Sequence, residues 1–443
     1  MNEQLELFNI QNIPEEHAKP NILLAKTRLN SPQRDQIEFI HSSIDDLIAD
    51  DHPVRDIWNY VNQMDMSSFL QKIKSRTDSP GRPAIDPKIL FALWIYAISE
   101  GIGSARVIDR YCNQHLAFRW LCGGVSVNYH SISDFRKNHA EEFDELIALT
   151  VARLINVGLI TMERVSQDGM KVRASAGSSS FRRKPKLKEL LIEAKERVKA
   201  LRKEIDEDPT ACLDRRKAAK KRAAEERMNR IEQALKEHKK TTIEASFQKK
   251  KHYKPFTQEE KGKIRASTTD FEAKKMKMAN GGFNPAYNMQ ISIDTGSRFI
   301  LGAYVVNKVN DTGQLVPMFE HIKKRYKKIP KEWLVDQGYL DRSKIAEVQK
   351  SCCKVYVNPK SNEKVNIKCE DDELTEWRNR MNTDEAKEIY KDRASNSEWA
   401  NAGMRNRGLK QLLVRGLKNV QNVLNLHVLS HNILRACKFG YVW

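Results

Sequence analysis

Apolar and polar residues alternate along several stretches after residue 158, and this period of two predicts β-strands. The alternation is clearest over residues 170–175 and 289–294. Residues 299–306 are apolar at successive positions, which is typical of a strand buried on both faces. Two shorter apolar runs, 333–335 and 354–357, predict two further strands.

Between these strands the apolar positions recur every three or four residues, which predicts helices. Helical patterns cover residues 312–327, 342–350, 384–404 and 417–437, and a polar loop is expected at about 358–380. The order is therefore strand, insertion, strand, strand, helix, strand, helix, strand, helix. Without the insertion, this is the order of a ribonuclease-H-like α/β fold. We predict such a catalytic domain over residues 158–437.

Residues 31–157 have a helical pattern throughout and predict an all-α N-terminal domain. Asp86 and Pro87 are typical of a helix start, and the apolar run 89–98 that follows predicts a buried helix. Further helices are expected after Ser104, after Ser131 or Ser133, and over residues 141–156. The arginines among these short helices favour a DNA-binding bundle, and the alternative is a plain helical domain with solvated arginines. Residues 1–30 are mixed and polar, and predict a loosely held arm.

Residues 181–265 form a basic block that interrupts the predicted α/β domain. Apolar residues step by four and three positions from Leu187 to Ile205 and again from Ala224 to Leu235, with a turn at 206–210 between them. This heptad seam predicts an antiparallel helical hairpin. The block holds 28 Lys and Arg against 15 Asp and Glu, a net charge of +13. Charge of one sign favours a clamp on the phosphate backbone of DNA over a merely solvated coiled-coil surface.

The composition narrows the class of protein. The 443 residues carry a net charge of +19, which favours a polyanionic partner such as nucleic acid. The seven cysteines form no C-x-x-C pair, which argues against a zinc ribbon or a disulfide scaffold. With no signal-peptide pattern and no apolar run of membrane length, we expect a cytoplasmic protein without a membrane partner. No G-x-x-x-x-G-K-[ST] motif occurs, so we expect no nucleotide cofactor.

Three acidic residues stand where this fold would bring them together. Asp168 lies on the first predicted strand, Asp336 ends the fourth, and Glu398 lies on the helix that closes the domain. The first and fourth strands are neighbours in such a sheet. Carboxylates suit Mg²⁺, and two such ions about 3.5–4 Å apart can stabilise the attacking and leaving oxygens of a phosphodiester displacement. The pattern therefore predicts a metal-dependent site for cutting and joining DNA.

The residues around these acids resemble the DDE transposases of bacterial insertion sequences, in the group with a helical insertion after the first aspartate. The resemblance covers nearly the whole chain from about residue 40 to 437. It rests on the stretches GRPAIDPKILFALWIYAISEGIGSARVIDRYC, QDGMKVRASAG, MKMANGGFNPAYNMQISID, NDTGQLVPM, VDQGYLD, ASNSEW and RGLKQLLVRGLKNVQ.

This resemblance implies that Asp168, Asp336 and Glu398 are the catalytic triad and hold two Mg²⁺ (or Mn²⁺) ions. Related transposases carry Tyr, Arg and Lys around the glutamate. Tyr390, Arg393 and Arg405 stand there in this chain, which makes them candidates for DNA binding. Arginine replaces the lysine at 405, and Arg393 precedes Glu398 by five residues rather than four.

The implied function is metal-dependent strand cleavage and strand transfer at the terminal inverted repeats of an insertion sequence. The partners are double-stranded DNA, at those repeats and at the target, and a second copy of the chain, because two ends must be brought together. Two alternatives stay open. One is a metal-dependent nuclease of the same fold that does not transpose, and the other is a catalytically inactive DNA-binding protein.

Other polar residues are assigned structural roles. Asp294 precedes Thr-Gly-Ser and predicts a hairpin turn. Asp311 is interpreted as the N-cap of the helix that follows, with a supporting role at the site left open. Residues 281–288 are interpreted as a turn into the second strand. His427 and His431 stand four residues apart, but Val428 replaces the glutamate of a zinc-protease pair, so both are predicted to pack in the core.

Overall fold

The structure is a computed structural model that describes residues 42–75, 82–207, 215–251, 255–359 and 372–441. Residues 44–443 form one compact unit. The predicted polar arm at 1–30 lies outside the described residues, as does most of the turn at 206–210.

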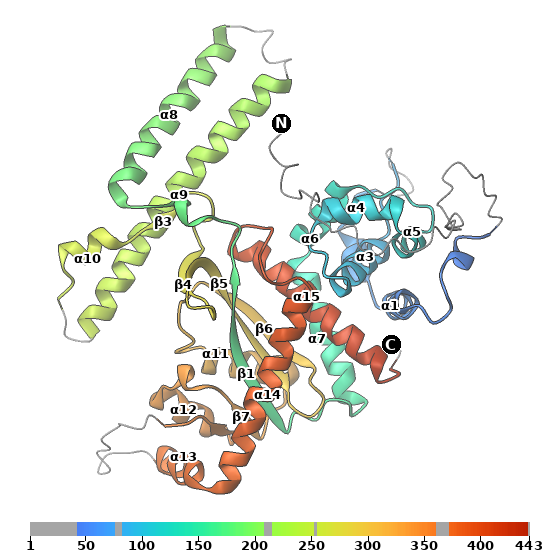
Figure 1. Cartoon of the computed structure of the whole chain (residues 1–443), viewed down its shortest axis with the longest axis vertical. Coiled ribbons are helices and arrows are strands. Elements are labelled where there is room, and N and C mark those ends of the chain that lie inside the picture. Colours follow the sequence, from blue (N-terminus) through green and yellow to red (C-terminus); the bar gives the residue numbers. More distant parts are fainter. Residues whose placement is uncertain (1–41, 76–81, 208–214, 252–254, 360–371, 442–443) are drawn as a thin grey trace, which may run out of the picture. The chain divides into compact units, whose positions relative to one another are not determined.

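The N-terminal region is helical, as its sequence pattern predicts (Figure 1). Its most buried helix, α3, begins after Asp86, whose side chain accepts a hydrogen bond from the backbone N–H of Lys88. Eleven of the 13 residues of α3 are buried, so the buried helix predicted from the apolar run 89–98 is confirmed. The helices are α1 (Pro53–Asn62), α2 (Ser67–Gln71), α3 (Pro87–Ser99), α4 (Ala105–Gln114), α5 (Leu116–Cys122), α6 (Tyr129–Asn138) and α7 (Ala140–Asn156).

The start of α6 differs from the prediction of a cap at Ser131 or Ser133. The helix begins at Tyr129, and the side chain of Asn128 accepts a hydrogen bond from the backbone N–H of Ser131. Asparagine ranks with serine as an N-cap, and the sequence offers both within a few residues. The prediction was therefore wrong by about one helical turn.

A curled sheet of six strands follows the N-terminal helices (Figure 1). The strand order is β4-β5-β1-β7-β8, with β6 paired to β5. β1 is antiparallel to β5 and parallel to β7, so the first and fourth predicted strands are neighbours, as expected. The strands are β1 (Arg164–Arg173), β4 (Lys274–Lys277), β5 (Phe283–Asp294), β6 (Ile300–Val306), β7 (Glu332–Leu334) and β8 (Lys354–Tyr356).

Of the two sequence predictions around β5, the first differs from the structure and the second is confirmed. Residues 283–288, interpreted as a turn, already belong to β5, where they pair with β4 and β1. The predicted turn at Asp294 is confirmed, because its Oδ2 accepts hydrogen bonds from the backbone N–H and the hydroxyl of Ser297.

Five helices pack on or beside the sheet. They are α11 (Leu315–Tyr326), α12 (Arg342–Gln349), α13 (Asp372–Asn382), α14 (Asp384–Asn406) and α15 (Leu417–Lys438). The prediction of a polar loop through residue 380 was wrong from residue 372 onward, because α13 buries Trp377 and Met381 within a largely charged sequence. The remainder of that loop, from 360 to 371, lies outside the described residues.

The insertion is a helical hairpin, as predicted (Figure 1). Its helices α8 (Lys184–Glu207) and α9 (Arg215–Lys251) pack along their length, and ion pairs from Lys195 to Glu232 and from Arg202 to Glu225 connect them. The helix α10 (Gln258–Lys263) follows. The strands β2 (Phe181–Arg182) and β3 (Ala266–Ser267) pair where the hairpin joins the sheet.

The long helix α15 connects the N-terminal helices to the sheet. The Asn432 side chain exchanges two hydrogen bonds with the backbone of Ile300 on β6, and the Asn422 side chain donates to the backbone oxygen of Arg136 on α6. His427 and His431 are buried on this helix, as predicted, and burial lowers their pKa values to about 3 and about 4. In the described part of the chain, no helix has the length and apolar character needed to cross a membrane.

Candidate functional site

Asp168 and Asp336 are brought together by the pairing of two parallel strands. Ser166 on β1 lies opposite Leu334 on β7, and each aspartate stands two residues beyond that pair. β7 ends at Leu334, and Asp336 caps the short turn that follows by accepting the backbone N–H of Gly338 at 2.9 Å. The two carboxylates therefore lie at the same end of neighbouring strands.

Asp311 reaches the same place from the loop between β6 and α11. Its Oδ1 accepts hydrogen bonds from the side-chain amides of Asn288 and Gln290 on β5, both at 2.7 Å. Its carboxylate also lies directly over Gly169, where an added Cβ would be 2.1 Å from Oδ1. The predicted N-cap role was wrong, because α11 begins at Leu315 and its N-cap is Gln314.

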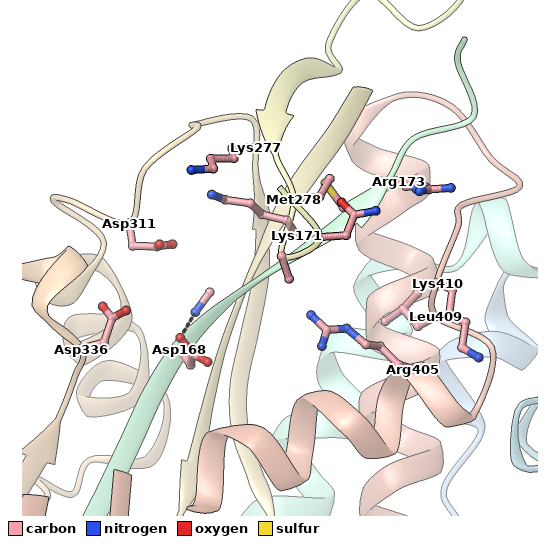
Figure 2. A pocket seen from close by; sticks show the side chains of 13 residues that line it. Asp168, Lys171, Arg173, Lys277, Met278, Asp311, Asp336, Arg405, Leu409 and Lys410 are labelled. Atoms are coloured by element: carbon pink, nitrogen blue, oxygen red, sulfur yellow. Dashed lines mark hydrogen bonds between the residues drawn. The ribbon is translucent and has the colours of Figure 1, made fainter. Parts of the chain in front are cut away.

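The three aspartates line one pocket of about 530 Å³, together with five basic side chains (Figure 2). In Figure 2 the acids lie on one side of the pocket, and the basic residues lie above and opposite. The basic residues are Lys171, Arg173, Lys277, Arg405 and Lys410. Such a separation of charge suits a ligand that is itself polyanionic and is bound together with cations.

Burial and mutual repulsion perturb the acids. Burial, followed by the charge of Asp336, raises the pKa of Asp168 to about 6. Burial and the charge of Asp311 raise the pKa of Asp336. Arg393 on α14 acts against both shifts, because its positive charge lowers the pKa of each aspartate. A pocket that destabilises its own carboxylates is typical of a site that functions with a bound cation.

A buried polar network underlies the pocket. Gln167 on β1 donates to Gln290, and Trp333 on β7 donates to Gln167. The Tyr339 hydroxyl also donates to Gln290, whose amide in turn holds Asp311. Because every member is fixed by its neighbours, the network sets the position of Asp311 relative to β1 and β7.

Helix α14 lies against the face of β1 that carries Ser166 and Asp168. Ser397 and Ser166 share a hydrogen bond of 3.0 Å, and Asn401 donates to Asp168 Oδ2 at 2.9 Å. Glu398 is exposed on this helix and is not among the residues that line the pocket. The structure thus brings Asp168 and Asp336 together and leaves Glu398 exposed on α14, outside the pocket that they line.

The three DNA-binding candidates on α14 lie at different positions around the site. Arg405 lines the pocket. Arg393 is close enough to Asp168 and Asp336 to affect both pKa values, and its guanidinium lies over the ring of Tyr390, 5.5 Å from its centre. Burial raises the pKa of Tyr390.

The donor set is of the kind that hard divalent cations prefer, since carboxylate oxygens dominate it. Across the described residues, no three His, Cys, Asp or Glu side chains are gathered tightly enough to hold a metal ion as they stand.

The sequence pattern did not indicate a role at the site for several residues that line the pocket. Lys171 and Arg173 were noted only as the polar positions of an alternating strand, and no motif pointed to Lys277 or Lys410. Asn401 is three residues from Glu398, and only its contact with Asp168 indicates a role. Asp311 was considered for a supporting role at the site, but its position just before a predicted helix favoured a role as the N-cap of that helix.

Two family models match the chain, one near each end. Residues 42–138 match a transposase domain (DUF772), and residues 341–437 match a transposase DDE domain. The second match contains α13, α14 and α15, and thus Glu398, but not Asp168 or Asp336. No curated protein and no solved structure matches the chain. DDE transposases act on DNA and generally use divalent metal ions. With a transposase domain at one end and a transposase DDE domain at the other, the two matches together support a DDE transposase of an insertion sequence.

Proposed function

We propose that this transposase cuts DNA at the terminal inverted repeats of its element and joins the freed 3′ ends to target DNA. The proposed catalytic residues are Asp168, Asp336 and Glu398, with two Mg²⁺ or Mn²⁺ ions. The observation that carries the proposal is the pocket in which aspartates lie on one side and basic residues on the other (Figure 2). Acids suit the cations, and basic side chains suit the phosphates of DNA.

The sheet supports a ribonuclease-H-like catalytic domain over residues 158–437. The parallel pair β1 and β7 carries two of the proposed acids, and the antiparallel strands β5 and β6 extend the sheet beyond β1. The hairpin at 181–265 leaves this sheet after β1 and returns before β4. We assign residues 31–157 and the hairpin to DNA binding.

The chain's own groups would orient the acids. The backbone N–H of Gly169 and the amide of Asn401 each hold one oxygen of Asp168, and Gly338 holds one oxygen of Asp336. When bound, divalent ions would activate the attacking hydroxyl and stabilise the leaving oxygen at phosphorus. Lys171, Arg173, Lys277 and Lys410 would bind backbone phosphates and so place the scissile bond against the acids.

Glu398 requires a movement of its side chain or its helix. Its neighbours Ser397 and Asn401 contact Ser166 and Asp168, so α14 already lies against the strand that carries the first acid. In the proposal, Glu398 turns toward Asp168 and Asp336 when DNA and metal ions bind, and Tyr390, Arg393 and Arg405 contact phosphates. Two copies of the chain would hold the two ends of the element.

The test uses a plasmid that carries the DNA flanking the gene, incubated with the full-length protein and Mg²⁺. We expect nicks at the ends of the element, joined products, and loss of both in Asp336→Asn. The control is Asp341→Asn, because Asp341 stands five residues later, bonds to Ser343 and lies outside the pocket.

Three results would contradict the proposal. Nicks without joined products identify a nuclease. DNA binding without nicks identifies a DNA-binding protein. Cleavage that persists in Asp336→Asn with unchanged metal dependence removes the assigned role of the acids.

A further inference from the structure

A second pocket lies at the base of the helical hairpin and is lined by three arginines. It has a volume of about 320 Å³ and is formed by Arg227 and Arg230 on α9, Arg415 before α15, and Thr268 and Thr269 after β3. Leu190 and Ile231 complete its wall, and no acidic residue in the described part of the chain lines it. The guanidinium groups of Arg227 and Arg230 on one helix and of Arg415 on another segment repel one another unless an anion lies between them.

The arginines have few competing partners within the described residues. The Arg227 side chain makes no hydrogen bond or ion pair with another described residue. Arg230 has a single acidic neighbour, Glu226, at 3.6 Å. Arg415 uses its Nε to donate to the backbone oxygen of Ser175 at 3.2 Å, which fixes the side chain and leaves its two terminal NH₂ groups for a ligand.

Two acids that follow the threonines in sequence bond to groups other than the arginines. Asp270 Oδ1 accepts from the Tyr287 hydroxyl at 2.7 Å and from the backbone N–H of Gly416 at 3.3 Å. Glu272 Oε2 accepts from the backbone N–H of Leu417 at 2.7 Å. These contacts connect the segment that carries the threonines to the segment that carries Arg415, and so hold Arg415 beside the threonines.

The same segments connect this pocket to the pocket of the aspartates. Residue 173 at the end of β1 bridges to Gln411, and the backbone N–H of Leu412 donates to the backbone oxygen of Arg173. Arg173 and Lys410 line the aspartate pocket, whereas Arg415 lines the arginine pocket. From Asp168 to Arg173 and from residue 411 to residue 415 the chain spans at most about 30 Å in total, the axial rise of roughly nine nucleotides of duplex DNA.

We propose that Arg227, Arg230 and Arg415 bind one backbone phosphate of the substrate DNA, within about nine nucleotides of the cut. Arginine forks recognise phosphate oxygens through paired hydrogen bonds, and the two threonine hydroxyls add donors. The bound phosphate would connect the hairpin to the catalytic sheet. This inference rests on the proposed function, because the distance is counted from the cleavage site.

The first experiment measures DNA affinity of the full chain as a function of salt, in EDTA so that no cleavage occurs. For Arg227→Ala and Arg415→Ala we expect affinity to fall by about tenfold. The slope of log affinity against log salt should fall by about 0.9 for the lost phosphate contact. The control is Arg222→Ala, since Arg222 lies on the same helix, is exposed and does not line the pocket. Equal losses in all three variants would show a general effect of charge and overturn the proposal.

The second experiment replaces single phosphates of the duplex by uncharged methylphosphonates. One position within about nine nucleotides of the cut should weaken binding to the wild type and have no further effect on Arg227→Ala or Arg415→Ala. If every position weakens the variants as it weakens the wild type, the proposal is wrong. Competition by inorganic phosphate as effective as by duplex DNA would identify a free-anion site and also overturn it.

Two further measurements keep the outcomes separate. If the alanine variants do not fold, Arg227→Lys and Arg415→Lys replace them. These lysine variants retain the charge but lose the paired hydrogen bonds of arginine, so they should lose part of the DNA affinity. The binding experiments are repeated with Asp336→Asn. If Asp336→Asn still cleaves but the methylphosphonate result holds, the catalytic proposal fails and the phosphate site stands. If cleavage depends on Asp336 but every methylphosphonate weakens DNA binding by the arginine variants as it weakens binding by the wild type, only the phosphate site is wrong.

Discussion

The carboxylate of Asp311 occupies the space that a side chain at position 169 would need. An added Cβ on Gly169 would lie 2.1 Å from Asp311 Oδ1 and 2.8 Å from Gln290 Nε2. The glycine that follows Asp168 in sequence therefore allows a carboxylate from a distant loop to approach the first strand. Asp311 can therefore join the other aspartates in the pocket only because residue 169 has no side chain.

Gly169→Ala should displace Asp311 and disturb the acids beside it. Overpacking costs about 1–3 kcal/mol of folding free energy, and a displacement of about 1 Å at an active site can lower the rate roughly 100-fold. We expect DNA cleavage to fall far more than the melting temperature. Gly177→Ala is the control, because its added Cβ would meet only Ser179 Oγ at 3.5 Å. If cleavage is the same in the two variants, the close approach is unimportant.

Asp311→Asn should separate the structural and electrostatic roles of this residue. The asparagine carbonyl can still accept from Asn288 and Gln290, so the fold should keep its melting temperature. The lost negative charge should lower Mg²⁺ affinity, measured by calorimetry, and cleavage by roughly 100-fold. Unchanged cleavage and Mg²⁺ affinity would limit Asp311 to a structural role.

Asp168→Asn should raise the melting temperature in EDTA at neutral pH. The pKa of Asp168 is raised to about 6 from its ordinary value of 3.8, so the folded protein favours the neutral form. The wild type therefore loses stability as pH rises from about 4 to 6, and asparagine does not. We expect a gain of at least about 2 °C above pH 6, shrinking toward zero below pH 4. Mg²⁺ should stabilise the wild type and not the variant. A gain that is independent of pH would contradict this account.

Glu398→Gln should abolish strand cleavage while DNA affinity in EDTA stays close to that of the wild type. Loss of one charged group at a phosphoryl-transfer site lowers the rate by about 100-fold to 1,000-fold. Glu388→Gln is the matched control on the same helix, since Glu388 is exposed and paired with Lys391. Equal activity of the two variants would remove Glu398 from the proposed triad.

Much of the fold could be predicted from periodicity, because most helices and the strands β1, β5, β6, β7 and β8 carry a continuous apolar pattern. The strand β4 was not predicted, because Met276 is its one apolar residue. The pairing of β1 with β7 followed from the order of elements, and it brings Asp168 and Asp336 together. Helix α13 was missed because its two buried residues, Trp377 and Met381, leave no apolar stripe long enough to detect.

The details of the site depend on contacts that no local pattern carries. Asp311 binds Asn288 and Gln290, which lie more than 20 residues away in sequence. Its local sequence equally suits a helix cap, so only the folded chain distinguishes the two roles. The arginine pocket joins three segments that are separated in the same way.

The hairpin leaves the sheet at one end of a strand pair and returns at the same end. Arg173 closes β1 opposite Ala286 of β5, and β4 begins with Lys274, which also lies opposite Ala286, so residues 174–273 leave and re-enter the sheet at the same level. The insertion can therefore change in length or sequence without altering the register of β1 against β5 and β7.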